Sequence, residues 1–543
     1  MNIINSILYI YNDMAVLFVD AIRLKYGYNL FPLFDSTIKI SGIDFLNSVS
    51  LVVLFRVFDP VVGANILSIF YLSLLLFFSY KLFSYFDVNK LLVIVFSVTN
   101  TFSIYMLYRI ISFTPNIYQV FFFPLVLLLL LKNKLSPLKL GLVVFLFFAS
   151  SLYNGYYSFW LIIFWWLSEL IYSLLLKKWE YLPAVKSFIA KVLLFSFPLL
   201  LIGGIAFGSL AIKTLPFLAK FDKSPQNKVI TNTPGAYRPI ENFYNLTFRP
   251  WYFVIPPKNS LFFGDFSKNT YKAIEDTGYY LANDYTEEEA AGSFIGWHML
   301  LGVFLAFGIL LFGNKYSLFF PTLFNYKQVV FKALLSIFLI FLISGPPSFT
   351  VNGFTFYTPS YLLYFVLPIF RTLVRFSSII FMLVLVINIF LYNDLLFHIR
   401  SKVLKFLVFF LLITMNFIFF AIKLPVIDIN KPPKEFATIK LLPENSMVAV
   451  YPKADYKSMF WTSYTRVKLA NPNGFINLNS GFSSDSFTKR LTTQGGIDEG
   501  KLLGITHILY YKDNGLPETE ALFKKNASEI IDIDTSYVIY KLN

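Results

Sequence analysis

The fold is decided by residues 374–405, VRFSSIIFMLVLVINIFLYNDLLFHIRSKVLK. No charged side chain stands between Arg375 and Asp394 in this stretch. Basic residues follow in the next few positions: Arg400, Lys402 and Lys405. An apolar run of about 20 residues can cross the hydrocarbon core of a bilayer as an α-helix, and clustered Lys and Arg beside it are typical of the cytoplasmic side. The stretch therefore predicts a membrane-spanning helix followed by a cytoplasmic loop.

The composition of the whole chain supports a membrane protein. Of its 543 residues, 57% are hydrophobic and only 14% are charged, and the mean hydropathy is +0.63. A soluble domain carries about 25% charged residues, so this apolar excess requires lipid as a second solvent. The net charge is +15, but the basic residues cluster in short loops between apolar runs, so no nucleic-acid partner is expected. The absence of cysteine excludes disulfides, thiolate metal sites and a cysteine nucleophile.

Similar apolar runs recur along the chain and predict about ten spans. They lie near residues 61–83, 90–109, 116–132, 138–154, 157–176, 188–211, 293–313, 329–345, 374–394 and 404–424. If these helices alternate across the membrane, the basic loops all fall on one side, which should be the cytoplasm. Those loops contain Lys132, Lys134 and Lys139; Lys177, Lys178, Lys186 and Lys191; Lys315 and Lys327; and Arg400, Lys402 and Lys405. We therefore expect a mainly α fold, a polytopic transmembrane helix bundle in the cell membrane.

The polar segments between the runs all fall on the opposite, extracytoplasmic face. The expected order is a first external loop with interfacial helices (1–60), an N-terminal transmembrane bundle (61–211), a long external loop (212–292), a C-terminal transmembrane bundle (293–425) and a soluble extracytoplasmic domain (426–543). Residues 346–373 of the C-terminal bundle predict a re-entrant or interfacial segment, with a short helix in the proline-containing stretch 357–371. An N-terminus on the outer face also fits a further span before Met1.

The segment 426–543 has the composition of a soluble domain and predicts a small α/β fold. Residues 447–451, 505–511 and 536–540 read as strands. Residues 483–493 read as an amphipathic helix.

Local patterns along the chain carry a resemblance to a known family. They are Asn12-Asp13 followed by Tyr26-Gly27-Tyr28-Asn29-Leu30-Phe31-Pro32; Asp59-Pro60-Val61-Val62-Gly63-Ala64-Asn65 at the opening of a helix; Pro368-Ile369-Phe370-Arg371-Thr372-Leu373-Val374-Arg375-Phe376; and Leu503-Gly504-Ile505-Thr506-His507-Ile508-Leu509. In this order they resemble bacterial members of the GT-C glycosyltransferase superfamily, in particular the large integral-membrane proteins similar to YfhO. The resemblance implies a GT-C-like bundle and a polyprenyl-phosphate-linked sugar as donor. The chain departs from the family at its start, where the family's first span is absent.

An inverting sugar transfer needs a carboxylate that takes the proton from the acceptor hydroxyl as this hydroxyl attacks the anomeric carbon. Asp13, in the first external loop, is the leading candidate for this catalytic base. Asp20 is the second candidate, because the i, i+7 spacing puts it on the same face if the segment is helical. The alternative is that Asp13 is a solvated or helix-capping residue.

Arginines near the outer ends of the spans are candidates for binding the donor phosphate. Arg371 and Arg375 are spaced i, i+4 and share one helix face, and Arg109 ends the run 90–109. Fixed cations beside phosphate oxygens stabilise the charge that develops as the phosphate leaves. The alternative is that these side chains extend to lipid headgroups, as arginines at helix ends commonly do.

Further polar side chains on the outer face are candidates for binding sugar hydroxyls. They are Arg238 and Glu241 in the long loop, Asn116 and Gln119 at the start of a helix, and Tyr153 and Asn154 at a tight turn. The alternatives are that Arg238, Glu241 and the nearby Arg249 pair inside the loop, and that Asn154-Gly155 is an ordinary turn signal.

Together these patterns predict a cell-envelope glycosyltransferase that moves a sugar from a polyprenyl-phosphate donor to a glycan or lipid acceptor by an inverting single displacement. Membrane lipid is the other expected partner. No cofactor or metal is expected, since the three histidines are scattered, although a divalent cation held by other ligands stays open. The alternatives are a lipid-linked glycan flippase or transporter and a non-catalytic GT-C-like scaffold. Charged residues are rare inside the expected spans, which disfavours a coupled transporter.

Overall fold

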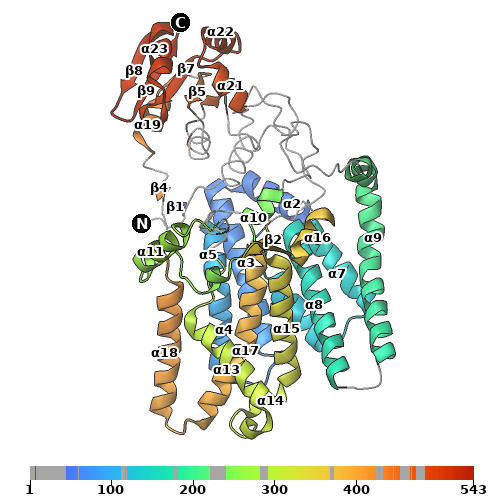
Figure 1. The fold of residues 1–543 in the computed structure, drawn as a ribbon. Coiled ribbons are helices and arrows are strands. Elements are labelled where there is room, and N and C mark those ends of the chain that lie inside the picture. The colour runs from blue at the N-terminus through green and yellow to red at the C-terminus, as the bar shows by residue number, and fades with distance from the viewer. Residues whose placement is uncertain are drawn as a thin grey trace.

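The computed structural model is a helical bundle with a sheet domain at one end (Figure 1). It describes residues 6–7, 45–58, 60–111, 117, 119–176, 181–219, 240–279, 281, 292–366, 372–423, 427–428, 432–443, 445–452, 461, 465, 467–471 and 484–543. We call the end of the bundle that faces the sheet domain the upper end. This is the end that the lysine pattern places outside the cytoplasm.

The bundle is built from two sets of helices separated by the long loop. The first set is α2 (Phe45–Val57), α3 (Pro60–Phe83), α4 (Lys90–Thr101), α5 (Ile104–Ile111), α6 (Phe122–Lys132), α7 (Pro137–Ser150), α8 (Leu152–Leu176) and α9 (Tyr181–Ala219). The second set is α13 (Trp297–Phe312), α14 (Pro321–Asn325), α15 (Lys327–Ser344), α17 (Ser377–His398) and α18 (Lys402–Phe420). Between and beside them lie α10 (Ile240–Asn245), the 3-10 turn η2 (Pro250–Phe253), α11 (Gly264–Glu275), strands β2 (Ser348–Val351) and β3 (Phe354–Tyr357), α16 (Pro359–Val366) and the 3-10 turn η4 (Leu373–Phe376).

Each expected apolar run overlaps an apolar helix, but the helices differ in length. Among the described residues, six helices are long and apolar enough to cross a membrane, or seven if α4 and α5, bent by 45° at their junction, form one span. Helices α6, α7 and α13 have 11, 14 and 16 residues. At about 1.5 Å per residue, each is shorter than the roughly 30 Å of a hydrocarbon core. A mainly helical fold with several helices long and apolar enough to span a membrane is therefore confirmed, whereas ten full-length spans stay a prediction.

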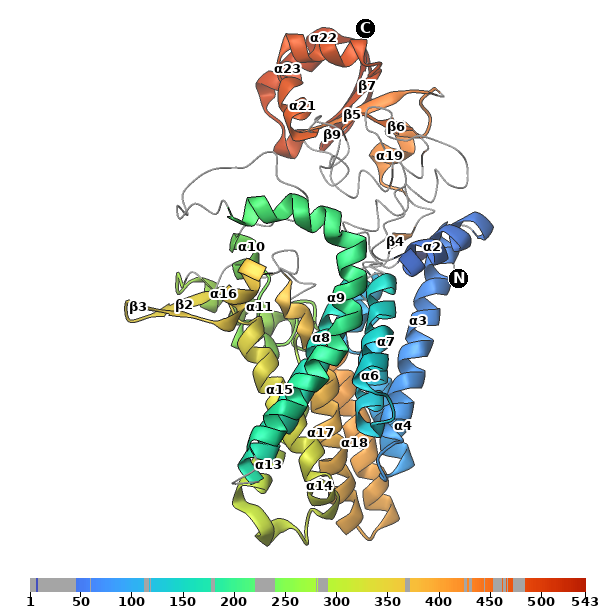
Figure 2. The same cartoon turned by 90° about the vertical axis from the view of Figure 1, so that its right-hand side faces the viewer.

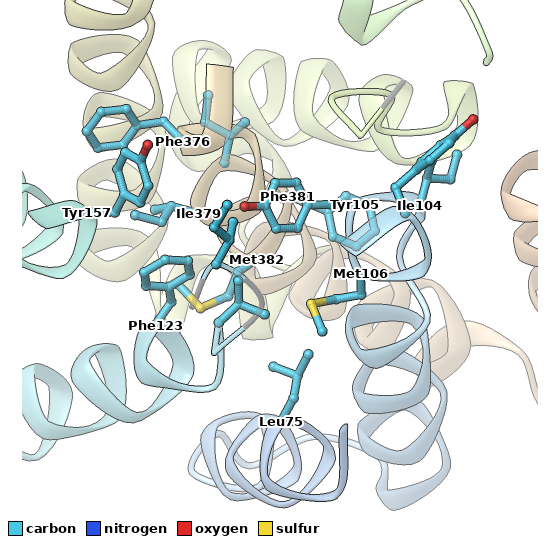
Figure 3. Packing of buried hydrophobic residues seen from close by; sticks show 14 of the residues in the cluster. Leu75, Ile104, Tyr105, Met106, Phe123, Tyr157, Phe376, Ile379, Phe381 and Met382 are labelled. Carbon is cyan, nitrogen blue, oxygen red and sulfur yellow. The ribbon is translucent and has the colours of Figure 1, made fainter. Parts of the chain in front are cut away.

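Helix α17 is the centre of the bundle. The span Leu373–His398 is 94% buried, whereas the other long spans are between 11% and 39% buried. Figure 3 shows Phe381 and Met382 of α17 packed among Tyr105, Met106 and Phe123 from α5 and α6. Because α17 is apolar on all sides, the surrounding helices must cover it completely.

The lower end of α17 is held by polar contacts. The fully buried carboxylate of Asp394 accepts hydrogen bonds from the backbone N–H groups of Thr322 and Leu323, at 2.9 and 2.8 Å. The neighbouring Asn393 donates to the Thr322 hydroxyl at 3.0 Å and accepts from the Asn89 N–H at 2.9 Å. A carboxylate that faces the first N–H groups of a helix is favourably placed, which accounts for a buried acidic residue at this position.

Helix α9 differs from the expected boundaries. It begins at Tyr181 and continues to Ala219, beyond the expected end of its run at residue 211. Only 11% of its span is buried, and Figure 1 shows it along one side of the bundle. It approaches α7 closely at Gly141, where a Cβ atom would lie 2.2 Å from the Phe195 carbonyl oxygen.

The C-terminal segment forms the expected α/β domain. Its five-stranded sheet has the order β6-β5-β7-β9-β8, with β5 parallel to β6 and β7, and β9 antiparallel to β7 and β8. The strands are β5 (Met447–Tyr451), β6 (Lys468–Leu469), β7 (His507–Tyr511), β8 (Ala527–Ile533) and β9 (Tyr537–Leu542). The helices are α19 (Lys434–Ile439), α21 (Ser484–Arg490), α22 (Gln494–Leu502) and α23 (Pro517–Asn526), of which the last three contribute Phe487, Ile497 and Phe523 to one core with the sheet.

Helix α19 is attached to the edge of this sheet by two carboxylates. Asp532 accepts hydrogen bonds from the hydroxyls of Tyr537 at 2.7 Å and Thr438 at 2.8 Å. Asp534 pairs with the Lys434 ammonium at 2.7 Å. The hydrogen bond from Lys434 lowers the pKa of Asp534 to about 2, and the hydrogen bonds from Tyr537 and Thr438 lower the pKa of Asp532.

These carboxylates predict an acid-sensitive attachment of α19. Both carboxyl pKa values are below the usual value of 3.8, so their contribution is complete above about pH 4 and is lost as the pH falls toward 2. Asp532→Ala should weaken the attachment by about 1–2 kcal/mol near neutral pH, and the difference from the wild type should shrink below pH 4. Amide hydrogen exchange of α19 in the full-length protein, compared at matched pH, measures this. Asp513→Ala, in the turn after β7, is the control, and a pH-independent difference would contradict the assignment.

Helices α13 and α17 approach each other closely at Gly302. The side-chain amide of Asn388, which is fully buried in the middle of α17, donates to the Met299 carbonyl at 3.0 Å and to the Val384 carbonyl at 2.9 Å. A Cβ atom on Gly302 would lie 1.9 Å from Asn388 Oδ1. Small residues permit such contacts between helices in membranes, and Asn388 is held in place by both bonds.

Gly302→Ala should therefore destabilise the protein by about 1–3 kcal/mol, since Asn388 must leave its position. Gly308→Ala is the matched control in the same helix, because nothing lies within 4 Å of its added Cβ. It should be neutral or slightly stabilising, as alanine is the better helix former. Thermal unfolding of the purified protein in one detergent measures both variants. Equal melting temperatures for the two would show that the close approach is unimportant.

Candidate functional site

The candidate site is the junction of α8 and η4 at the upper end of the bundle. The Tyr157 hydroxyl donates to the Thr372 carbonyl at 2.8 Å, and its ring packs edge-on against Phe376, with centroids 4.7 Å apart (Figure 3). The guanidinium of Arg375 lies over the ring of Tyr153, 5.1 Å from its centroid. Two of the predicted substrate-binding residues, from segments more than two hundred positions apart, are therefore in contact.

The long loop enters this junction. The Val374 N–H donates to the Leu246 carbonyl at 3.0 Å, and the Phe248 N–H donates to the Ser344 carbonyl at 2.8 Å. Residues 244–249 thus lie between η4 and the upper end of α15. The long loop also contacts the 346–373 region, through the hydrogen bond between the hydroxyls of Tyr244 and Ser348, at 2.6 Å.

Arg249 organises the loop from inside. Its guanidinium is 1% exposed and donates from Nε to the Leu281 carbonyl at 2.9 Å and from Nη1 to the Thr247 hydroxyl at 2.7 Å. Nη2 donates to the Tyr244 carbonyl. These contacts satisfy backbone groups that would otherwise lie buried without donors. The structure therefore favours internal bonding for Arg249 over a role in binding sugar.

Gln119 and Asn154 also bond within the protein. Gln119 is fully buried, donates to the Tyr71 hydroxyl at 2.9 Å and accepts from the Ser150 hydroxyl at 2.7 Å. The side-chain amide of Asn154 donates to the Ile117 carbonyl at 2.9 Å. These bonds connect the segment before α6 with α3 and the α7–α8 junction. The expected turn at Asn154-Gly155 is wrong, because both residues lie in the first turn of α8, and a role of Gln119 or Asn154 in binding sugar stays a prediction.

Several buried polar atoms at this junction have no protein partner. Within the part of the chain that the structure describes, Asn154 Oδ1, Ser158 Oγ and Ser377 Oγ are buried and accept or donate no hydrogen bond. Asn154 and Ser158 are spaced i, i+4 on one face of α8, and Ser377 directly follows η4, which packs on α8. Buried polar atoms without a partner cost free energy, so each of them calls for a bound water or a ligand.

Arg109 occupies a separate place on α5. Its guanidinium is 1% exposed and lies over the Tyr105 ring, 5.0 Å from the centroid. The neighbouring Tyr108 donates its hydroxyl hydrogen to Asn259 of the long loop. Arg109 therefore lies where α5 meets this loop, but as a stacked and buried side chain rather than one reaching out to headgroups.

The packing beneath the junction excludes a sugar. A cavity of about 10 Å³ is lined by Leu75, Asn100, Ser103, Met106, Val120, Phe123, Pro124, Ser378 and Met382. This volume holds about one water molecule. This cavity is therefore too small for a sugar.

The remaining predicted residues cannot be placed in this geometry. Asp13, Asp20, Asn116, Arg238 and Arg371 lie outside the described residues, and Glu241 belongs to α10 with only its backbone described. Their proposed roles stay predictions. No group of three or more His, Asp or Glu side chains suited to a metal ion occurs within the described ranges.

No protein-family model matches the chain, and no curated protein matches it. The fold and the site define a class in physical terms, a multi-pass helical protein suited to a membrane, with a small α/β domain and a cation–aromatic junction at one end.

Arg249 generates a stability prediction. Arg249→Met should lower the free energy of unfolding by roughly 3 kcal/mol, since several buried acceptors lose a charged donor, each bond being worth about 1–3 kcal/mol. Arg490→Met is the control, because Arg490 pairs with Glu499 at 3.0 Å on an exposed surface, where ion pairs contribute about 0–1 kcal/mol. Thermal unfolding and limited proteolysis of the loop measure the effect. If the loop of the Arg249→Met variant resisted proteolysis as well as the wild-type loop, the structural role of Arg249 would be contradicted.

Proposed function

We propose that the protein is an integral-membrane glycosyltransferase that moves a sugar from a polyprenyl-phosphate donor to a glycan or lipid acceptor at the upper end of the bundle. The observations that carry this proposal are the contact of Arg375 with Tyr153, and the buried polar atoms without a hydrogen-bond partner in the adjoining elements, Asn154 and Ser158 on α8 and Ser377 at the start of α17. A cation, an aromatic ring and unsatisfied hydrogen-bonding groups are the chemistry that a sugar phosphate requires. The resemblance of the sequence to YfhO-like GT-C proteins supports the same function.

The proposed reaction is a single displacement with inversion. The acceptor hydroxyl attacks the anomeric carbon, the bond from this carbon to the phosphate oxygen breaks, and the lipid phosphate leaves with the bonding electrons. The hydroxyl proton passes to a carboxylate, the role assigned to Asp13 with Asp20 as the second candidate. Arg375, and Arg371 beside it in sequence, would stabilise the charge on the leaving phosphate. No step requires a metal, and a divalent cation as a further partner stays open.

The transporter alternative is weakened by the charges inside the bundle. Glu169 of α8 lies 3.4 Å from the Lys191 ammonium of α9 and 3.8 Å from the Lys332 ammonium of α15. Lys332 also lies over the Trp165 ring, 5.7 Å from its centroid. These charges pair with one another towards the lower ends of their helices, rather than lining a path at mid-membrane.

The test is a transfer assay with radiolabelled polyprenyl-phosphate sugar and purified protein in liposomes. Arg375→Met should reduce the transfer rate by about 10²-fold, as removal of one group that stabilises developing charge does, and Arg375→Lys should recover part of it. Asp13→Asn should abolish transfer with the fold intact. Arg400→Met, in the exposed loop before α18, is the matched control and should transfer at the wild-type rate.

Two results would contradict the proposal. Full transfer by Arg375→Met would remove the phosphate role of the junction, and full transfer by Asp13→Asn would remove the assigned base. Movement of the lipid-linked sugar across the liposome membrane without any transfer would identify a flippase instead.

A further inference from the structure

Strands β2 and β3 form a hairpin that the sequence analysis did not predict. Four residues of each strand pair, from Ser348↔Tyr357 to Val351↔Phe354. The turn is Asn352-Gly353, with φ values of 49° and 83°, and two positive φ values are typical of a type I′ hairpin turn. The start of the expected interfacial helix, Tyr357, is instead the last residue of β3, and α16 begins at Pro359.

The two faces of the hairpin have opposite chemistry. Cross-strand pairing puts Phe349, Val351, Phe354 and Phe356 on one face, since side chains alternate along a strand. The rings of Phe349 and Phe356 stack with centroids 5.4 Å apart. The other face carries Ser348, Thr350, Thr355 and Tyr357, and the hydroxyls of Thr350 and Thr355 lie 3.1 Å apart.

The apolar face is largely exposed. Phe354 is 71% exposed, Phe356 52% and Val351 49%. A two-stranded hairpin is marginally stable by itself in water, and a contiguous exposed apolar surface marks an interaction site. The hairpin therefore needs an environment that covers this face.

The surroundings of the hairpin identify that environment. Figure 2 shows the hairpin extending sideways from the upper end of α15, across the direction of the bundle helices. The neighbouring helices also expose apolar side chains, since Phe338 and Leu342 of α15 are 56% and 39% exposed and Leu362 of α16 is 66% exposed. Helix α15 is one of the helices long and apolar enough to span a membrane, and if it does, the hairpin that follows it starts near the boundary of the bilayer.

The composition of the hairpin fits the same place. Residues 348–357 contain three phenylalanines, one tyrosine and no charged side chain. Aromatic residues are enriched at the boundary between lipid and water. The outer edges of both strands carry backbone groups that do not pair within the two-stranded sheet, and such edges are not tolerated in the hydrocarbon core. These two requirements together place the hairpin among the headgroups rather than deeper.

We propose that the β2–β3 hairpin is an interfacial anchor, which lies in the leaflet nearest the sheet domain with its phenylalanine face toward the acyl chains. The anchor connects to the long loop through the hydrogen bond between Tyr244 and Ser348, and the Thr358 hydroxyl, which donates to the Pro346 carbonyl at 2.7 Å, joins the two ends of the hairpin. It therefore fixes the height of the long loop relative to the lipid surface. The inference does not depend on the proposed sugar transfer.

The absence of cysteine from the chain allows a direct test with single spin labels. Phe354→Cys and Thr355→Cys place the label on adjacent residues that face opposite sides, and the protein is reconstituted in phosphatidylcholine–phosphatidylglycerol vesicles. Collisions with oxygen report lipid contact, and collisions with a water-soluble nickel chelate report water contact. The ratio of oxygen to nickel accessibility should be severalfold higher at position 354 than at position 355.

Two results would overturn the proposal. Equal nickel accessibility at both positions would place the hairpin in water, and a label at position 354 shielded from both reagents would show that protein, such as a second copy, covers this face. Val351→Cys and Thr350→Cys repeat the comparison on the other strand, so a folding defect at Phe354 would leave the test intact.

Discussion

Helix α17 has almost no surface left for lipid, because its span is 94% buried, and the rest of the bundle is arranged to cover it. Apolar contacts alone would leave its rotation and depth poorly defined, since it is apolar on every side. The polar residues of α17 fix its rotation and its depth in the bundle. Asn388 bonds to the Met299 carbonyl of α13, and Asp394 bonds to the first N–H groups of α14. Polar bonds of this kind are retained in an apolar medium because an unpaired group there is costly.

The candidate site depends on the same helix. The turn η4 leads directly into α17, so the position of Arg375 follows from the burial of the residues after it. Tyr157 of α8 and Leu246 of the long loop both bond to this turn, at Thr372 and Val374. A side chain on a turn fixed from three directions keeps its geometry when a ligand binds, which favours recognition because little order has to be gained.

Hydropathy is sufficient to predict the apolar helices, because every lipid-facing surface must be apolar whatever the packing. The alternation of apolar and polar residues predicts strands β5, β7 and β9. Hydropathy did not predict where helices bend or continue, so the 45° break between α4 and α5 and the extension of α9 to Ala219 were missed. The hairpin was overlooked although Asn352-Gly353 is a strong turn signal, because proline nearby suggested a re-entrant helix. The sequence predicts Arg375 and Tyr153 as substrate-binding residues. It does not predict that they contact each other, because their segments are brought together only by the folding of the bundle. Gln119 is also a predicted substrate-binding residue, but the structure shows its amide hydrogen-bonded within the protein, to Tyr71 and Ser150.

The two ends of the bundle differ in how their polar groups are satisfied, and this difference carries the functional argument. At the lower end, Glu169 is neutralised by Lys191 and Lys332, and Asp394 is bonded to α14, so the protein supplies its own partners. At the upper end, among the described residues, Asn154 Oδ1 on α8 and Ser377 Oγ at the start of α17 are buried without a hydrogen-bond partner. A protein tolerates uncompensated buried groups where something else completes them. The asymmetry therefore assigns a structural role to the lower charges, and it is the reason for placing the proposed site at the upper junction.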